Sequence, residues 1–306
     1  MHERSVLSIG ELLWDMLPSG PRLGGAPFNA VAHMARLGHA AAILSAVGDD
    51  ELGRCARAEV ERLGVRTDVL QTVAAAPTGT VAVELDAQGH PSYVIETPAA
   101  YEYATGSSDV LNSIRALDPA AVVFGTLAQR SGTVRSATEA VLAAQPEAIP
   151  VYDINLREGC WTPALVDELL RFAMVLKLNE DELDVLGSEL GLDHGDIPSF
   201  AADATRRYPH VSLVCVTRGG KGAVLWTREA QSQLGGLDVS VVDTVGAGDA
   251  FTAGLVHGLL AGRPLPEIGQ LANALGAIVA SREGAVPAWS AEDLAWFTDL
   301  PVLGRG

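Results

Sequence analysis

The sequence predicts an α/β fold in which a mostly parallel sheet is covered by helices. Short apolar runs alternate with stretches of helical periodicity along most of the chain, which is typical of parallel strands linked by helices. Only 5% of the residues are aromatic, whereas 32 of the 306 are glycine, and this composition suits closely packed elements joined by many turns. With 48% hydrophobic residues, the chain can fill the large core that such a fold needs.

The first third of the chain contains two predicted strand–helix pairs and a hairpin. Apolar patterns predict strands at Ser5–Gly10 and Ala41–Gly48, and helices at Asn29–His39 and Asp50–Gly64. Thr78–Glu96 alternates apolar and polar residues around a turn at Asp86–Pro91, so it is predicted to be an antiparallel hairpin. Together with the stretch around Glu11–Gly25, this hairpin is expected to form a small β insertion.

Strand–helix alternation resumes after the hairpin. Four further strands are predicted at Ala120–Thr126, Ile149–Asn155, Met174–Asn179 and Val211–Thr217. Val216–Trp226 has the pattern of two strands joined by a glycine-rich turn. Near the end, Leu237–Asp243 is predicted to be a strand, Asp249–Gly262 a helix, and Asn273–Ala288 an apolar helix followed by a loop.

Charge and cysteine content narrow the classes of partner and compartment. The formal net charge is −17, which argues against binding to nucleic acid or to an anionic membrane, because both need a basic surface. Cys55, Cys160 and Cys215 are widely spaced and form no CxxC pair, as expected for reduced thiols in a cytoplasmic protein. Glu11 and Asp15 interrupt the first apolar run, so neither a signal peptide nor a membrane span is expected.

Five polar motifs are expected at the carboxyl ends of strands, where open α/β sheets bind their ligands. They are Gly24–Asn29, Asp153–Arg157, Asn179–Glu182, Thr217–Gly222 and Asp243–Asp249. Because these ends meet at one edge of a sheet, the motifs together indicate a single ligand site.

The motif DTVGAGDAF, from Asp243 to Phe251, carries the most specific chemistry. Its glycines lie at a predicted strand-to-helix turn, where backbone amides converge and the positive end of the helix dipole favours an anion. Asp249 would begin the helix, and two interpretations stay open from the residues alone: a helix cap, or a base that accepts the proton of a hydroxyl. A dinucleotide fingerprint fits less well, because Phe251 fills the third glycine position, and the spacing around Lys221 is not that of a Walker loop.

Two stretches resemble the signatures of a known family. DTVGAGDAFTAGLV, from Asp243 to Val256, resembles the carboxyl-terminal signature of the ribokinase-like (PfkB) carbohydrate kinases at every position. GGAPFNAVAHMARLG, from Gly24 to Gly38, is similar to the amino-terminal signature of that family. The resemblance implies one domain over residues 1–306, a ribokinase-like three-layer α/β/α sandwich with a mostly parallel central sheet. It also implies a small β-sheet lid made of two segments, approximately residues 11–25 and 78–104.

The same resemblance implies the catalytic roles at the glycine-rich turn. Asp249 would accept the proton of a sugar hydroxyl as that hydroxyl attacks the γ-phosphate of ATP. The amides of Gly246, Ala247, Gly248 and Asp249 would form an anion hole for the charge on the phosphoryl group. Phosphoryl transfer depends mainly on positioning and charge stabilisation, so this arrangement suits the chemistry.

The resemblance also implies where the nucleotide and the metal ions bind. The T-x-G-x-x-G loop of the family is matched by Thr217, Gly219 and Gly222. Asn273 matches a nucleotide contact, and Lys177 is also expected to bind ATP. Asn179 and Glu182 match an NxxE motif, which implies a site for Mg2+ held through phosphates and water. A monovalent cation such as K+ is implied at Asp243, Val245, Val279 and Gly284. An acidic first helical turn would by itself also explain Glu182.

The sugar site is implied by resemblance to the fructokinase-like branch. Asp15, Gly25, Asn29 and Arg157 match positions that hold sugar hydroxyls or border the active site, next to Asp249. Fructose, converted to fructose 6-phosphate, is therefore the leading substrate. Ribose, 2-keto-3-deoxygluconate, a nucleoside or a phosphosugar are alternative substrates, and a non-catalytic sugar-binding protein and a nucleotide-dependent oxidoreductase are alternative functions. Tyr93 or Tyr101 of the lid is expected to cover the sugar, and a homodimer through the lid is expected by analogy with relatives.

Overall fold

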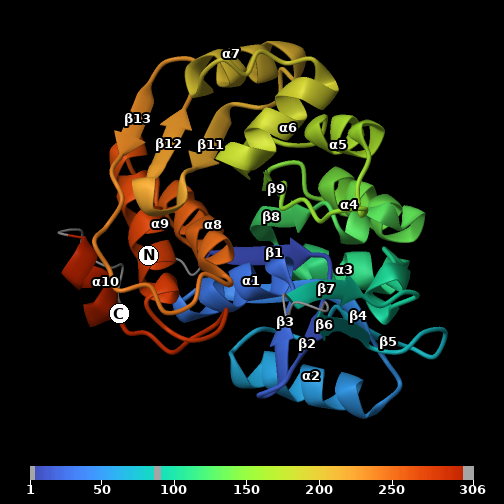
Figure 1. Cartoon of the computed structure of the whole chain (residues 1–306). Coiled ribbons are helices and arrows are strands. Elements are labelled where there is room, and N and C mark those ends of the chain that lie inside the picture. Colours follow the sequence, from blue (N-terminus) through green and yellow to red (C-terminus); the bar gives the residue numbers. More distant parts are fainter. Residues whose placement is uncertain (1–3, 86–90, 299–306) are drawn as a thin grey trace.

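A computed structural model describes residues 4–85 and 91–298 of the protein. Its centre is a nine-stranded sheet in the order β13-β12-β11-β10-β9-β8-β1-β4-β5 (Figure 1). The strands of this central sheet are β1 (Ser5–Ile9), β4 (Ala40–Gly48), β5 (Leu70–Val73), β8 (Pro119–Gly125), β9 (Ile149–Asp153), β10 (Val175–Asn179), β11 (Leu213–Thr217), β12 (Ala223–Trp226) and β13 (Gln231–Leu234). The predicted α/β fold is therefore confirmed.

Most neighbouring strands of the central sheet run parallel. Every pairing from β5 to β11 is parallel, whereas β12 and β13 are antiparallel additions at one edge. Chain order reverses at β1, which lies between β4 and β8. The carboxyl end of β1 therefore borders a topological switch point, the place where sheets of this kind bind ligands.

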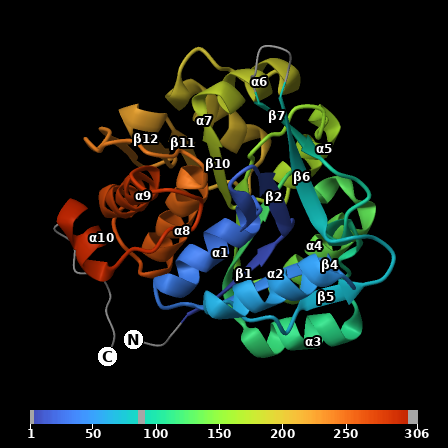
Figure 2. The ribbon, with the colours of Figure 1, turned by 60° about the horizontal axis from the view of Figure 1, so that its bottom comes forward.

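Helices cover both faces of the central sheet, so its strands are apolar on both faces (Figures 1 and 2). Leu7 and Phe124 belong to the core on one face, and their neighbours Val6 and Val123 belong to the core on the other. The first face carries α3 (Ser108–Leu117), α4 (Gly132–Ala144), α5 (Pro163–Leu170), α6 (Glu180–Leu190) and α7 (Ile197–Arg207). The second carries α1 (Ala26–Arg36), α2 (Glu51–Arg62), α8 (Ala247–Leu260), α9 (Leu265–Ala280) and α10 (Ala291–Phe297). In the part of the chain that the structure describes, none of the helices combines the length and hydrophobicity of a membrane span.

A second, smaller sheet has the order β3-β2-β6-β7. Its strands are β2 (Leu13–Leu17), β3 (Gly20–Gly24), β6 (Gly79–Leu85) and β7 (Pro91–Ile95). The predicted hairpin is confirmed, because β6 and β7 pair antiparallel; residues 86–90 of its expected turn lie outside the described residues. Asp50 joins this sheet to α2: its carboxylate accepts the N–H of Gly53 at the start of the helix and both the N–H and the hydroxyl of Thr78, just before β6.

The predicted strand at Leu237–Asp243 is wrong. This segment is irregular, and the side chains of Val241 and Val242 are 62% and 61% exposed. The N–H groups of Val242 and Asp243 donate to the carbonyl of Ala280 at the end of α9, at 2.9 and 3.2 Å, and not to a strand. The apolar pattern therefore occurs in a loop, and β13 forms the edge of the sheet instead.

Three helices begin earlier than the sequence pattern predicted. α1 begins at Ala26 and not at Asn29, α8 begins at Ala247 and not at Asp249, and α9 begins at Leu265, before Asn273. Gly25 and Gly246 are the N-cap residues of α1 and α8, with φ angles of 115° and 76°. These positive angles suit glycine, so each glycine-rich turn ends at its own glycine and the helix starts directly after it.

Candidate active site

A cavity of about 800 Å³ lies where the small sheet faces the carboxyl ends of the central strands. This volume is within the range of small-molecule sites, roughly 300–1,000 Å³. The N-terminal parts of α1 and α8 also border it. The predicted site residues that line it are Asp15, Gly25, Asn29, Arg157, Lys177, Asn179, Glu182, Thr217, Asp243, Val245, Gly246, Gly248, Asp249 and Gly284.

The turn before α8 is built around Gly246. A Cβ atom at this position would lie 2.6 Å from the Cα of Ala285, so the neighbouring loop leaves no room for a side chain. The N–H of Ala247 donates to the carbonyl of Thr244 at 3.3 Å, whereas the amides of Gly248 and Asp249, in the first turn of α8, have no earlier helical residue to accept from them. The start of α8 is therefore suited to an anion in the cavity.

Asp249 is the third residue of α8 and does not cap it. The cap is Gly246, without a side-chain hydrogen bond, and the Oδ2 of Asp249 instead accepts from the Nδ2 of Asn29 on α1 at 2.8 Å. Asp249 is half-buried and faces the cavity. Burial raises the pKa of Asp249 to about 6, and the charge of Asp153 adds to this effect, while the hydrogen bond from Asn29 opposes it. A carboxylate with this pKa is largely ionised at neutral pH and can still accept a proton, as a general base must.

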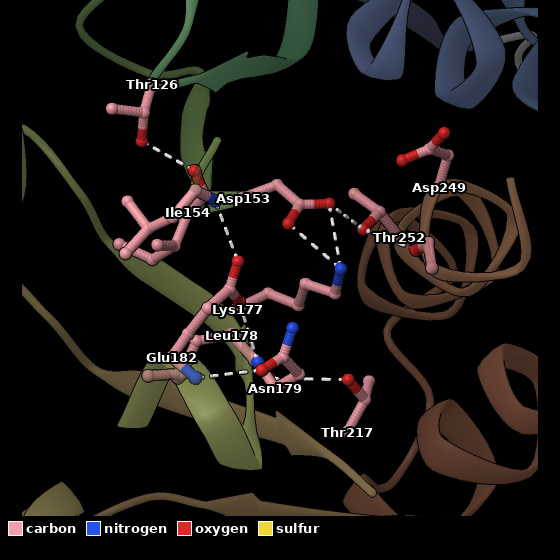
Figure 3. A network of polar contacts seen from close by, with 12 residues as sticks. Thr126, Asp153, Ile154, Lys177, Leu178, Asn179, Glu182, Thr217, Asp249 and Thr252 are labelled. Carbon is pink, nitrogen blue, oxygen red and sulfur yellow. Dashed lines mark hydrogen bonds and ion pairs between the residues drawn. The ribbon is translucent and has the colours of Figure 1, made fainter. Parts of the chain in front are cut away.

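A buried ion pair lies next to the start of α8 (Figure 3). The Nζ of Lys177 on β10 donates to both carboxylate oxygens of Asp153 on β9, at 2.9 and 3.1 Å, and the two side chains are 8% and 7% exposed. Thr252 of α8 donates its hydroxyl to the same carboxylate at 2.6 Å. A Cβ atom at Gly248 would lie 3.2 Å from the ammonium of Lys177, so this cation adjoins the backbone of the turn.

The charge of Lys177 is stabilised by its surroundings. Burial by itself would lower the pKa of Lys177, but the charges of Asp153 and Glu182 outweigh burial and raise it. The side chain therefore stays a cation at neutral pH, within the cavity wall. This positive charge adds to the helix dipole at the start of α8.

Asn179 and Glu182 form a reciprocal capping box at the start of α6. The Oδ1 of Asn179 accepts the N–H of Glu182 at 2.8 Å, and the Oε2 of Glu182 accepts the N–H of Asn179 at 2.9 Å. The other oxygen of Glu182 accepts the N–H of Leu156, in the loop after β9. Burial raises the pKa of Glu182, although the charge of Lys177 opposes the rise. The two predicted magnesium residues are thus brought together, but each also stabilises the start of the helix.

No cluster of three or more His, Cys, Asp or Glu side chains forms a metal site within residues 4–85 and 91–298. Among the described residues, the Oε1 of Glu182 accepts one hydrogen bond from Leu156 and its Oε2 one from Asn179, and a carboxylate oxygen has a further lone pair. Glu182 therefore fits a magnesium ion whose other ligands are phosphate oxygens and water, which is the usual manner of magnesium binding beside a nucleotide.

Of the other residues predicted to contact the nucleotide, Thr217, Gly219, Gly222 and Asn273, only Thr217 lines the cavity. Thr217 lines the cavity at the end of β11, whereas Gly219 lies in a single 3-10 turn, Gly219–Lys221. A Cβ atom at Gly222 would lie 2.1 Å from the carbonyl oxygen of Leu234, so close packing on β13 explains this glycine. Asn273 on α9 donates its Nδ2 to the carbonyl of Gly235 at 2.7 Å.

The predicted monovalent-cation residues are gathered by Asp243. Its carboxylate accepts the N–H of Val245 and the N–H of Gly284, both at 3.0 Å, and so joins the loop before α8 to the loop after α9. Val279 is fully buried in α9 and its carbonyl accepts the N–H of Arg282, while the carbonyl of the next residue, Ala280, accepts the N–H of Asp243.

The remaining predicted residues are those expected to bind the sugar. Arg157 is exposed, and its charge lowers the pKa of Asp15, although burial of Asp15 has the larger effect and raises the pKa. A Cβ atom at Gly25 would lie 2.3 Å from the carbonyl oxygen of Glu11, so the backbone there needs glycine. Tyr101 is buried, whereas the side chain of Tyr93 lies outside the described residues.

Three residues of this site were not predicted from the sequence: Glu11, Asp153 and Thr252. Glu11 was treated only as a charge that interrupts an apolar run, but it is 5% exposed and lines the cavity. Asp153 and Thr252 belong to motifs that were recognised, yet their pairing depends on a contact between residues 99 positions apart. Only the position of Asp153 as the last residue of a strand could have indicated its role.

Comparison with known proteins agrees with this geometry. Residues 21–292 match the model of a family described as pfkB family carbohydrate kinase. The chain belongs to this family. The predicted ribokinase-like fold and the predicted carbohydrate kinase are thereby confirmed.

Individual pfkB relatives are similar over nearly the whole chain. A fructokinase of Klebsiella pneumoniae is 32% identical over 308 residues, which cover 93% of this chain and 96% of that protein. The structure of a fructokinase with bound ATP from Xylella fastidiosa has a TM-score of 0.84 and 25% identity, and covers 97% of this chain and 98% of that one. A fructokinase from Vibrio cholerae O395, in a form bound to fructose, ADP and calcium, has a TM-score of 0.80 and 27% identity, and covers 97% and 99%.

Proposed function

We propose that this carbohydrate kinase transfers the γ-phosphate of ATP to a hydroxyl of fructose and so forms fructose 6-phosphate. One observation carries the proposal: Asp249, held by Asn29, faces a cavity at the amide-rich start of α8, next to the cation of Lys177. A base, an anion-binding turn and a buried cation are the groups that phosphoryl transfer to a hydroxyl needs. The similarity to proteins named fructokinase supports fructose as the acceptor.

In this proposal Asp249 accepts the proton of the attacking hydroxyl. The amides of Ala247, Gly248 and Asp249, together with Gly246, stabilise the charge on the phosphoryl group. Lys177 strengthens the positive potential at the start of α8. Asp153 accepts hydrogen bonds from its ammonium and is itself bonded by Thr252, so the cation is held in place. These groups are fixed before the substrate binds, so little free energy is lost in reorganising them during the reaction.

The phosphates of ATP would lie along the edge formed by Asn179, Glu182 and Thr217, which all line the cavity. Bound Mg2+ would neutralise phosphate charge there, with Glu182 and Asn179 as its nearest protein groups. Gly219, Gly222 and Asn273 would border the nucleotide farther from the reacting atoms. A monovalent cation such as K+ would bind by the loops that Asp243 joins, at Val245 and Gly284, with Val279 in the adjoining helix.

The sugar would bind between the small sheet and the carboxyl end of β1. Asp15, Gly25, Asn29 and Arg157 border this part of the cavity, and carboxylate, amide and guanidinium groups suit the many hydroxyls of a polyol. We treat the small sheet as a lid that excludes water from the reaction, and residues 1–306 as one kinase domain. A homodimer through the lid is part of the proposal, and Met16 of this sheet is 41% exposed. A cytoplasmic location is also proposed, since all three cysteines are free.

A coupled assay of ADP formation across a panel of acceptors tests the proposal. The panel contains fructose, ribose, 2-keto-3-deoxygluconate, nucleosides and phosphosugars. We expect the highest kcat/KM with fructose, and the product should carry phosphate on the 6-hydroxyl by NMR. A higher kcat/KM with another acceptor would replace fructose while keeping the kinase. Tight sugar binding without turnover of any acceptor would instead indicate a non-catalytic sugar-binding protein.

A further inference from the structure

Glu11 is a buried carboxyl group at the centre of the fold. It follows β1 after a single residue, so it lies at the switch point between β4 and β8. The residue is 5% exposed and lines the cavity. Its Oε2 atom is fully buried and has no hydrogen-bond partner among the described residues.

An unpartnered buried carboxyl oxygen needs an explanation, because burial of such a group without a hydrogen bond is costly. Other buried side-chain atoms of the described residues also lack partners, but of these only the Oε2 of Glu11 and the Oδ1 of Asn29 belong to residues that line the cavity. Asn29 uses its other polar atom to bind Asp249. Two free acceptor atoms therefore adjoin the proposed base, where a ligand with hydroxyl groups would satisfy both.

The surroundings of Glu11 hold its side chain at this place. A Cβ atom at Gly25 would lie 3.3 Å from the Cγ of Glu11, so the start of α1 packs directly on the side chain. The backbone N–H of Ala26, the first residue of α1, also interacts favourably with the carboxylate. The side chain is thus fixed by neighbouring backbone, while its buried Oε2 has no hydrogen-bond partner among the described residues.

We propose that Glu11 binds the acceptor sugar directly, with its Oε2 in a hydrogen bond to a hydroxyl other than the one that is phosphorylated. The inference rests on the proposed function, since it assigns a further contact in the same acceptor site. A polyol suits this position, because its hydroxyl can donate to an ionised carboxylate and can also accept from a protonated one.

The charges around Glu11 make both protonation states accessible near neutral pH. Burial raises the pKa of Glu11 to about 7. The backbone N–H of Glu11 itself, the charge of Arg157 and the N–H of Ala26 oppose this rise, whereas the charge of Asp249 adds to it. Tyr101, which lies near enough for Glu11 to raise its pKa, is the remaining titratable neighbour. The affinity for the sugar should therefore change with pH between about 6 and 8 in the wild-type protein, and this change should disappear when Glu11 is replaced by glutamine.

The test compares Glu11→Gln and Glu11→Met with the wild type and with Glu139→Gln, whose side chain is exposed on α4. Steady-state kinetics with fructose and ATP give both KM values and kcat, and calorimetry gives the Tm of each protein without ligands. We expect the KM for fructose to rise about tenfold in Glu11→Met, as for the loss of a hydrogen bond to a charged group, with the KM for ATP unchanged. The ligand-free Tm at pH 8 should be equal to or higher than that of the wild type in Glu11→Gln, because a desolvated charge is removed.

Either of two results would overturn the inference. A KM for fructose within twofold of the wild type in both Glu11 variants would mean that the side chain does not touch the sugar. A lower Tm together with higher KM values for both substrates would assign Glu11 a structural role instead.

The inference and the proposed function can fail separately. If the wild type phosphorylates fructose but the Glu11 variants behave like Glu139→Gln, only the inference fails. If fructose is not phosphorylated, isothermal titration with the same acceptor panel decides. Fructose kinase activity would then be rejected, but the role of Glu11 would be supported if one sugar binds Glu11→Met at least tenfold more weakly than the wild type. Absence of binding by every sugar would reject both.

Discussion

Asp249 is the residue whose protonation should control the rate. A base must be ionised to accept a proton, and the pKa of Asp249 is raised to about 6, chiefly by burial. We therefore expect kcat with fructose to rise with pH through about 6 and to level off above pH 7. In Asn29→Ala the loss of the hydrogen bond that lowers this pKa should move the midpoint to higher pH. Initial rates at saturating ATP between pH 4.5 and 8.5 would measure both midpoints, and an unchanged midpoint in Asn29→Ala would separate Asn29 from the ionisation of Asp249.

Lys177 and Asp153 should behave as one unit. In Lys177→Met the carboxylate of Asp153 is left buried without its cation, and breaking a buried pair in this way typically costs about 3–5 kcal/mol. The double variant Asp153→Asn/Lys177→Met removes the uncompensated charge, so it should recover much of the free energy of unfolding measured in urea. Its turnover should stay low, because the cation next to Gly248 is still missing.

The double variant separates stability from function at this pair. Recovery of turnover along with stability would show that Lys177 serves only the fold. Equal stability of the single and double variants would show that the pair is not coupled.

At the scale of elements, the contact between α8 and α9 fixes the direction from which Asp249 enters the cavity. A Cβ atom at Gly254 would lie 2.7 Å from the backbone Cα of Ala272, whereas one at Gly132, at the start of α4, would meet nothing within 4 Å. Gly254→Ala should therefore force the helices apart, at a cost of about 1–3 kcal/mol, and should lower kcat by displacing the start of α8. Gly132→Ala is the matched control and should be neutral or slightly stabilising, because alanine favours helix over glycine.

Urea denaturation and kcat for the two alanine variants would measure this effect. Equal stabilities would mean that α8 and α9 separate without cost. A loss of stability in Gly254→Ala without a change in kcat would mean that the start of α8 is held independently, by its contact with the loop at Ala285.

Across the whole molecule, periodicity predicted those elements whose apolar pattern arises from burial on both faces of the sheet. Strands such as β1 and β8 were predicted for this reason, and the family signatures located the cavity. The pattern failed at Leu237–Asp243, where valines alternate in a loop that bonds to the end of α9. Apolar residues indicate a strand only if a neighbouring strand pairs with them, and pairing is not a local property.

The polar part of the site was predicted less completely, because its roles depend on tertiary contacts. Asp153 gains its function from Lys177 and Thr252, which come from two other elements. Glu11 differs from an ordinary surface glutamate in its burial and in the absence of a partner for its Oε2 within the described residues. Neither feature leaves a spacing that can be recognised in the sequence.

The two sheets meet at the cavity, so occupation of the cavity should stabilise the molecule as a whole. A ligand that binds only the folded state adds RT ln(1 + [L]/Kd), which is about 2.7 kcal/mol at a hundredfold excess over Kd. Fructose with a non-hydrolysable ATP analogue should therefore raise the Tm of the wild type. Asp249→Asn should show a similar rise, because asparagine keeps the shape of the side chain. Its turnover should nevertheless fall by about two to four orders of magnitude, as for the loss of a general base. Calorimetry and the coupled assay on the same two samples measure both effects. Near-normal turnover in Asp249→Asn would remove the base from the mechanism. Loss of the Tm rise would show that Asp249 acts in binding.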